Sequence, residues 1–181
     1  MGADSAKLFN KTLSDRILGM TKSELIRYVE ENLETLKEVE KSVGFVHSVV
    51  LFELNERGGS VAEAVERLIA ENNPLEDLKD QFIHDFAFGV EKLLLDYWGC
   101  YAEVFTEGNP KGSLSSMKYF GYEEEMYLFL KPQHVDRMIR SLKQHLDDLR
   151  IMGKAEIERL EYFRDFCVGH PGYWMAYIFD F

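Results

Sequence analysis

The chain has 181 residues, of which 46% are hydrophobic and 29% are charged, a composition typical of a globular protein and not of a disordered one. It carries 21 Lys and Arg against 32 Asp and Glu, a formal net charge of −11 that argues against binding to nucleic acid or to anionic membranes. The same charge favours solubility or a basic protein partner.

The first residues, MGADSAKLFN, lack the apolar stretch of a secretory signal. The two cysteines, Cys100 and Cys167, have no CxxC spacing, and without an export signal they are expected to be reduced thiols of the core. These features predict a cytoplasmic protein.

The first half of the chain has the pattern of helices. A short helix is expected before Ser14, and Thr21 to Glu24 form a capping box at the start of a longer one. Apolar residues then recur at gaps of three and four from Leu25 to Leu54, with Gly44 as the expected break. The segment SVGFVHSVVLF, residues 42–52, is so apolar that we expect it to be buried on most sides.

Two further helices are predicted before residue 99. Ser60 to Glu63 form a second capping box, and Asn73-Pro74 is typical of another helix start. The apolar spacing after Pro74 predicts a helix that continues to about Trp98.

The composition changes after Gly99. Residues 106–116, TEGNPKGSLSS, predict a loop, and CYAEVF (100–105) and EMYLFLK (125–131) predict strands on either side of it. Lys131-Pro132 predicts a helix start, Gly153 a separation from the last helix, and GHPG (169–172) a turn.

The chain closes on YWMAYIFDF, residues 173–181, which is apolar on both faces of a strand. We favour an integral strand that is covered on both sides or central in a small sheet. The alternative is an exposed edge that supports dimerisation or strand addition by a partner.

Together these elements predict an α+β fold that is predominantly helical. We expect a single domain over 1–181, with a helical part over about 1–99 and a mixed α/β part over about 100–181. The small antiparallel sheet is expected only after residue 99.

The histidines are the residues to examine for metal chemistry. His47, the pair His84-Asp85, and then Asp147 and Asp148 follow one another along the chain in an order that resembles HD-type metal phosphohydrolases. The resemblance implies a divalent metal held by His47, His84 and Asp85, and a hydrolase as the alternative function. However, Phe82, Ile83, Phe86 and Phe88 surround the pair with bulk where a metal site needs space, so the leading prediction is no metal and no cofactor.

No spacing of nucleophile, base or phosphate-binding loop is present in the sequence, so no catalytic residue is predicted. Aromatic residues beside carboxylates favour a binding rim, with the rings as anchors and the charges as steering groups. The candidate partner-binding residues are Tyr119, Tyr122, Glu123, Glu124, Glu125 and Trp174.

The leading hypothesis is therefore a small acidic cytosolic protein that acts by protein–protein interaction. A toxin-neutralising immunity protein or a regulatory binding protein belongs to this class, because an acidic inhibitor suits a basic target. A homo-oligomer that buries the aromatic C-terminal segment between copies is a further possibility.

Overall fold

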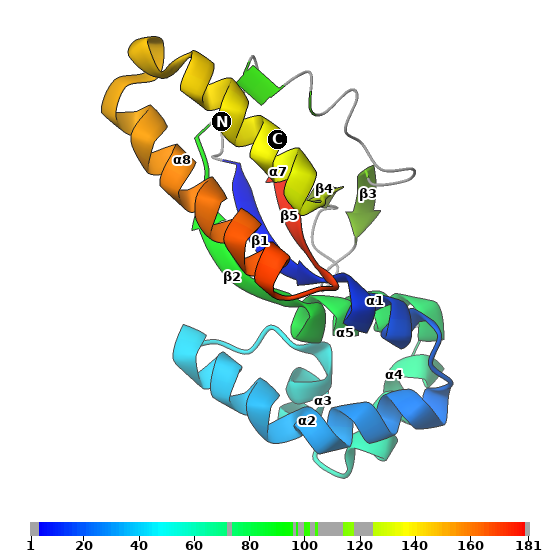
Figure 1. The fold of residues 1–181 in the computed structure, drawn as a ribbon. Coiled ribbons are helices and arrows are strands. Elements are labelled where there is room, and N and C mark those ends of the chain that lie inside the picture. Colours follow the sequence, from blue (N-terminus) through cyan, green and yellow to red (C-terminus); the bar gives the residue numbers. More distant parts are fainter. Residues whose placement is uncertain are drawn as a thin grey trace. The chain divides into compact units, whose positions relative to one another are not determined.

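Residues 4–71, 74–95, 97, 100–101, 104, 114–117 and 125–179 are described in a computed structural model of the chain (Figure 1). They form two compact units. The first, the sheet unit, contains residues 4–12 and the described residues after 87. The second, the helical unit, contains Leu13–Ala87. The fold is α+β and mostly helical, which confirms the predicted class.

The sheet unit contains five antiparallel strands in the order β2-β1-β5-β4-β3. These strands are β1 (Ser5–Asn10), β2 (Phe88–Leu93), β3 (Leu114–Met117), β4 (Glu125–Leu130) and β5 (Tyr173–Phe179). The C-terminal strand β5 is central, with β1 on one side and β4 on the other. Its predicted role as an integral strand is confirmed.

Two helices, α7 (Pro132–Gln144) and α8 (Leu146–Gly169), lie side by side against one face of this sheet (Figure 1). Helix α7 begins after Lys131, as predicted, and the Lys131 backbone N–H donates to His134 Nδ1 at 3.1 Å. The core between sheet and helices includes Leu8, Leu128, Leu130, Met138, Ile139, Leu142, Leu160, Phe163, Met175 and Tyr177.

The opposite face of the sheet carries a row of aromatic side chains. The Phe9 ring centroid lies 4.9 Å from that of Phe88 and 4.5 Å from that of Phe129. Ala176 and Ile178 of β5 are buried on this same face. Both faces of β5 are therefore apolar and buried, because Met175 and Tyr177 belong to the other core.

A glycine is required at the turn before β5. Gly172 has φ 96°, and a Cβ placed there would clash with Thr12 Oγ1. Its carbonyl accepts a hydrogen bond from the Lys11 backbone N–H at 2.9 Å, which ties this turn to the end of β1. Both the left-handed conformation and the close approach exclude a larger residue.

Two strands lie where helix was expected. Residues 5–10 form β1 instead of a helix before Ser14, and the helix expected up to Trp98 ends at Ala87 and gives way to β2. The sheet is thus not confined to residues after 99, and the part expected to be helical, about 1–99, contains two of its strands. The reason is non-local: β1 pairs with both β2 and β5, and local spacing does not encode such pairing.

Three further boundaries differ from the prediction. Cys100, Tyr101 and Val104 have helical backbone instead of forming a strand, and β1 pairs with β5 instead. The last residues of the expected loop, from Leu114, belong to β3. The break between the last two helices falls at His145, and Gly153 lies buried within α8.

In the described residues the helical unit contains five helices (Figure 1). The first of them, α1, follows directly after β1. Their bounds are α1 (Lys11–Leu18), α2 (Lys22–Val43), α3 (Val49–Arg57), α4 (Val61–Ala70) and α5 (Leu75–Ala87). Both predicted N-caps are confirmed, because Thr21 Oγ1 accepts from the Glu24 N–H at 3.2 Å and Ser60 Oγ from the Glu63 N–H at 3.1 Å.

The interior of the helical unit is apolar, with a few buried charges that have partners. Its buried residues include Leu25, Val29, Leu36, Val50, Leu51, Ala64, Val65, Leu68, Leu78, Phe82 and Ile83. Lys79 Nζ donates to the Leu18 carbonyl at 2.9 Å, and the buried Glu53 accepts from Arg67 Nε at 2.8 Å. The first contact connects α5 to the last residue of α1, and the second connects α4 to α3. Among the helices described, none combines the length and the apolar character needed to cross a membrane.

Candidate functional site

The segment between α2 and α3 exposes apolar side chains to solvent. Among the described residues eleven large hydrophobic side chains are exposed, and five of them fall between positions 39 and 52. We call these five the α2–α3 surface: Val39, Val43, Phe45, Val46 and Phe52. Phe45 is 63% exposed and Phe52 is 52% exposed, so the expectation that residues 42–52 are buried on most sides is wrong.

A groove of about 420 Å³ adjoins this surface. It is lined by Lys37, Glu40, Lys41, Gly44, Phe45, Val46, Leu51 and Asn55. Lys37 and Lys41 are one helical turn apart on α2, whereas Leu51 and Asn55 are one turn apart on α3. The groove therefore runs between the two helices and combines apolar walls with two cationic side chains.

The turn that presents Phe45 begins at Gly44, which ends α2 as predicted. Gly44 has φ 80°, and its N–H donates to the Glu40 carbonyl at 3.0 Å. A Cβ at this position would meet nothing within 4 Å, so the backbone conformation and not space is what favours glycine. The left-handed conformation ends the helix, and the next residues, Phe45 and Val46, are exposed.

The Glu40 carboxylate holds this turn in place by hydrogen bonds to its backbone. Glu40 is only 5% exposed, and its two oxygens accept from the backbone N–H groups of His47 at 3.0 Å and Ser48 at 2.8 Å. The His47 ring also contacts it, with Nδ1 2.5 Å from Glu40 Oε1. The same ring packs edge-on against Phe45, with centroids 5.5 Å apart, so Glu40 positions the most exposed residue of the surface through His47.

Asp85 extends this network into the interior of the helical unit. Ser48 Oγ donates to Asp85 Oδ2 at 2.8 Å, and Asp85 Oδ1 is buried with no hydrogen-bond partner among the described residues. Burial raises the pKa of Asp85 to about 8; the Glu40 charge adds to this increase, whereas the hydrogen bond from Ser48 opposes it. Asp85 is therefore largely protonated at neutral pH, which lowers the cost of burying it beside Glu40.

His47 and Asp85, two of the three residues that the sequence suggests as metal ligands, belong to one hydrogen-bonded network. Glu40 and Ser48 link them. In the part of the chain that is described, no group of three or more His, Cys, Asp and Glu side chains could hold a metal ion. His84 lies next to Asp85 on α5 and is half-buried.

The predicted partner-binding residues lie elsewhere in the chain. Tyr119, Tyr122, Glu123 and Glu124 are outside the described residues, and Glu125 begins β4. Trp174 is a half-buried residue of β5, opposite Phe9 in the strand pairing. Its ring lies 5.5 Å from Lys11 Nζ and 5.3 Å from Lys131 Nζ, so two cation–π contacts join it to its own chain.

The sequence did not single out Phe45, Val46 or Phe52 as binding residues, because an apolar run is usually buried. A usable signal was nevertheless present. Gly44 is expected to break the helix, so the helical spacing that predicts burial need not continue into Phe45 and Val46.

No family model matches the chain, and neither the curated proteins nor the solved structures give a match.

Proposed function

We propose that this protein acts in the cytoplasm by binding another protein through the α2–α3 surface. The observation that carries the proposal is that Phe45 and Val46, two of the five exposed apolar side chains at residues 39–52, line a groove. Contiguous exposed apolar surface on a soluble protein is typical of an interaction site, whereas scattered apolar residues are not. Cys100 and Cys167 are not joined by a disulfide, which agrees with a reducing compartment.

The groove gives the proposed partner a place to anchor. An aromatic or aliphatic side chain of the partner would fill the space between Phe45 and Leu51 and would be shielded from water by the surrounding contacts. Glu40 and His47 hold the turn in place before binding, and such preorganisation reduces the entropy lost on association. An immunity protein or a regulatory inhibitor fits this mode of action.

The partner is expected to be basic. The chain has a formal net charge of −11, and Glu34, Glu38 and Glu56 are exposed on the two helices that form the surface. Lys37 and Lys41 are the local exceptions, and Lys37 Nζ already lies 3.2 Å from Glu34 Oε1. The overall field would speed the approach of a basic partner, an effect that salt screens.

The proposal is tested by affinity capture from the native host with the wild type, with Phe45→Ser and with Phe52→Ser. Both variants are expected to lose the captured protein while they stay folded, since exposed substitutions usually change stability by about 0.5 kcal/mol or less. Val168→Ser is the matched control, because Val168 is 67% exposed on α8, away from the groove residues in sequence.

The outcomes separate the competing functions. Capture that survives in both Phe variants, or that is lost equally in Val168→Ser, contradicts the proposal. If only a second copy of this chain is recovered, and its mass in solution falls to that of a monomer in Phe45→Ser, the surface is a homo-oligomer interface and the proposed partner is wrong.

A further inference from the structure

A single serine links the α2–α3 surface to two carboxyl groups. Ser48 immediately precedes α3 and is fully buried. Its backbone N–H donates to Glu40 Oε1 at 2.8 Å, and its hydroxyl donates to Asp85 Oδ2 at 2.8 Å. Glu40 also accepts from the backbone N–H of His47, whose ring packs edge-on against Phe45. The turn that presents Phe45 is therefore held by side chains of two helices, α2 and α5.

The surroundings of Asp85 favour a protonated carboxyl. Its Oδ1 atom is buried and has no hydrogen-bond partner among the described residues, and the same holds for Oε1 of Gln81, one turn earlier on α5. Both oxygens can only accept hydrogen bonds unless Asp85 carries a proton, and that proton supplies a donor. Two carboxylates that share Ser48 would also repel one another. Burial and the charge of Glu40 accordingly raise the pKa of Asp85 to about 8.

Titratable groups surround Asp85 on its own helix and on two neighbouring segments. From α2, Glu40 adds to the rise in the pKa of Asp85. From the turn before α3, His47 contacts Glu40, with its Nδ1 2.5 Å from Oε1. On α5 itself, His84 is the adjacent residue, and the buried Lys79 donates to the last carbonyl of α1. Among these charged groups only Glu40 changes the pKa of Asp85, and it favours the protonated form.

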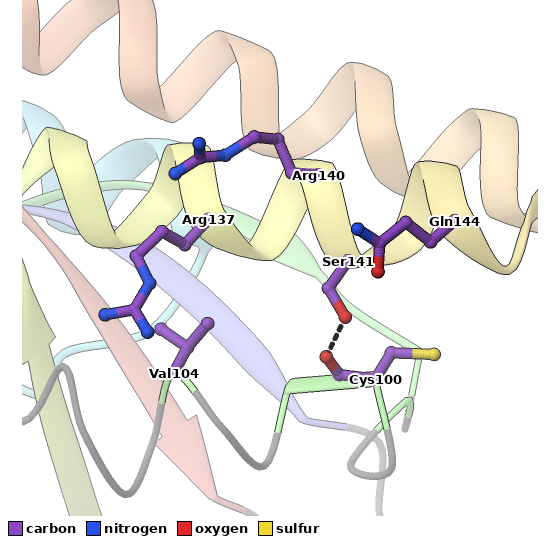
Figure 2. A pocket seen from close by; sticks show the side chains of 6 residues that line it. All are labelled: Cys100, Val104, Arg137, Arg140, Ser141 and Gln144. Atoms are coloured by element: carbon purple, nitrogen blue, oxygen red, sulfur yellow. Dashed lines mark hydrogen bonds between the residues drawn. The ribbon is translucent and has the colours of Figure 1, made fainter.

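The acceptor of its hydroxyl is what makes Ser48 sensitive to pH. Ser141 of α7, in the sheet unit, provides the contrast, because its hydroxyl donates to the backbone carbonyl of Cys100 (Figure 2). A carbonyl keeps the same charge at every pH, whereas a carboxyl gains or loses a proton. The hydrogen bond of the Ser48 hydroxyl therefore depends on the protonation of Asp85, and that of Ser141 depends on no proton.

We propose that the protonated carboxyl of Asp85 positions Phe45 for partner binding, through Ser48, and that loss of its proton releases the turn. An ionised carboxylate is stabilised by water, and water reaches the buried Oδ1 when Ser48 and its turn move away. The released turn loses the contact between His47 and Phe45. This inference rests on the proposed function, because the position of Phe45 affects binding only if the α2–α3 surface is the binding site.

The test is fluorine NMR of the full chain, with 4-fluorophenylalanine in place of Phe45. The resonance of the wild type is expected to shift with a midpoint at about pH 8, as the ring loses its contact with His47. Asp85→Asn is neutral and similar in shape, so it is expected to keep the resonance of the protonated wild type at every pH. Ser48→Ala removes the link and is expected to give the released resonance already at about pH 6, below the midpoint.

Asp80→Asn is the matched control. Asp80 is another half-buried acid of α5 whose pKa is raised by burial, but the Ser48 hydroxyl donates to Asp85. This variant is expected to titrate as the wild type does. In affinity capture of the proposed partner, Asp85→Asn is expected to keep the captured protein and Ser48→Ala to lose it.

A wild-type resonance that does not shift overturns the proposal. A shift that persists in Asp85→Asn also overturns it, because the titrating group would then be another one, such as His47. These two spectra are decisive even if Ser48→Ala fails to fold, which circular dichroism reveals. No partner takes part in the NMR measurement, so a failed titration contradicts only the positioning role of Asp85. Capture that survives in Phe45→Ser contradicts the proposed function instead.

Discussion

Replacing Tyr177 by alanine is expected to lower the free energy of unfolding by about 3–5 kcal/mol, a large part of the stability of a typical domain. Tyr177 is fully buried in the central strand β5, and its ring packs against Tyr101 and Phe179. Its hydroxyl donates to Asp4 Oδ2 at 2.6 Å. The substitution leaves a cavity in the core of the sheet unit and removes this link to the N-terminal end of β1.

The matched control is Tyr177→Phe, which keeps the ring and removes only the hydroxyl. It is expected to cost about 1 kcal/mol, the usual net contribution of one hydrogen bond. Urea unfolding followed by circular dichroism measures both variants. A loss below about 1 kcal/mol in Tyr177→Ala would show that β5 does not form the core of the sheet unit.

The second large effect is on the pH dependence of stability. Because the pKa of Asp85 is raised to about 8 in the folded protein, Asp85 keeps its proton at pH values where it is ionised in the unfolded chain. The folded state then binds more protons than the unfolded state between about pH 4 and pH 8. The stability that the bound proton provides is present at pH 4 and is lost above about pH 8. Between these values the free energy of unfolding falls by up to about 1.4 kcal/mol for each unit of increase in pH.

Asp85→Asn is expected to remove this decline, because asparagine is neutral in both states. The measurement compares the free energy of unfolding of the two proteins at pH 5 and pH 8, with the replacement of the exposed Glu31 by Gln as a control. Burial also raises the pKa of Glu156, and that carboxyl contributes a slope of the same sign to both proteins. The difference between them therefore isolates Asp85, and parallel pH profiles would show that its carboxyl is not held neutral.

Local signals in the sequence identified the elements that local physics determines. Thr21 and Ser60 cap helices because their hydroxyl groups satisfy backbone N–H groups that no helical turn can reach. Gly44 ends α2 because the left-handed conformation suits glycine. The two-faced apolar pattern of residues 173–181 favours an integral strand over an exposed edge, and β5 is indeed central, since a strand in the middle of a sheet is buried on both sides.

The elements that depend on distant partners were missed. Residues 88–93 continue the apolar spacing of α5, yet they form β2 because residues 5–10 provide a strand to pair with. Gly153 reads as a helix break, but a glycine within a helix costs only about 1 kcal/mol, which the packing of α8 against α7 offsets. Neither pairing nor packing between helices is visible in the local pattern.

The candidate site was missed for a related reason. Apolar residues are usually buried, so the sequence predicts burial for Phe45, Phe52 and their neighbours. The exposure of Phe45 follows from the turn at Gly44 and from the hydrogen bonds that Glu40 accepts from residues 47 and 48, a tertiary arrangement. The sequence suggests His47 and Asp85 as possible metal ligands, and in the structure they form hydrogen bonds with Glu40 and Ser48.

The most direct test of the α2–α3 surface is site-specific photo-crosslinking in cells of the native host. A benzophenone amino acid replaces Phe45 in one variant and Met152, which is 58% exposed on α8, in another. A protein-binding surface at residues 39–52 predicts a discrete crosslinked product, with a basic protein, from position 45 and none from position 152. No product at position 45, or the same products at both positions, would contradict the proposed function.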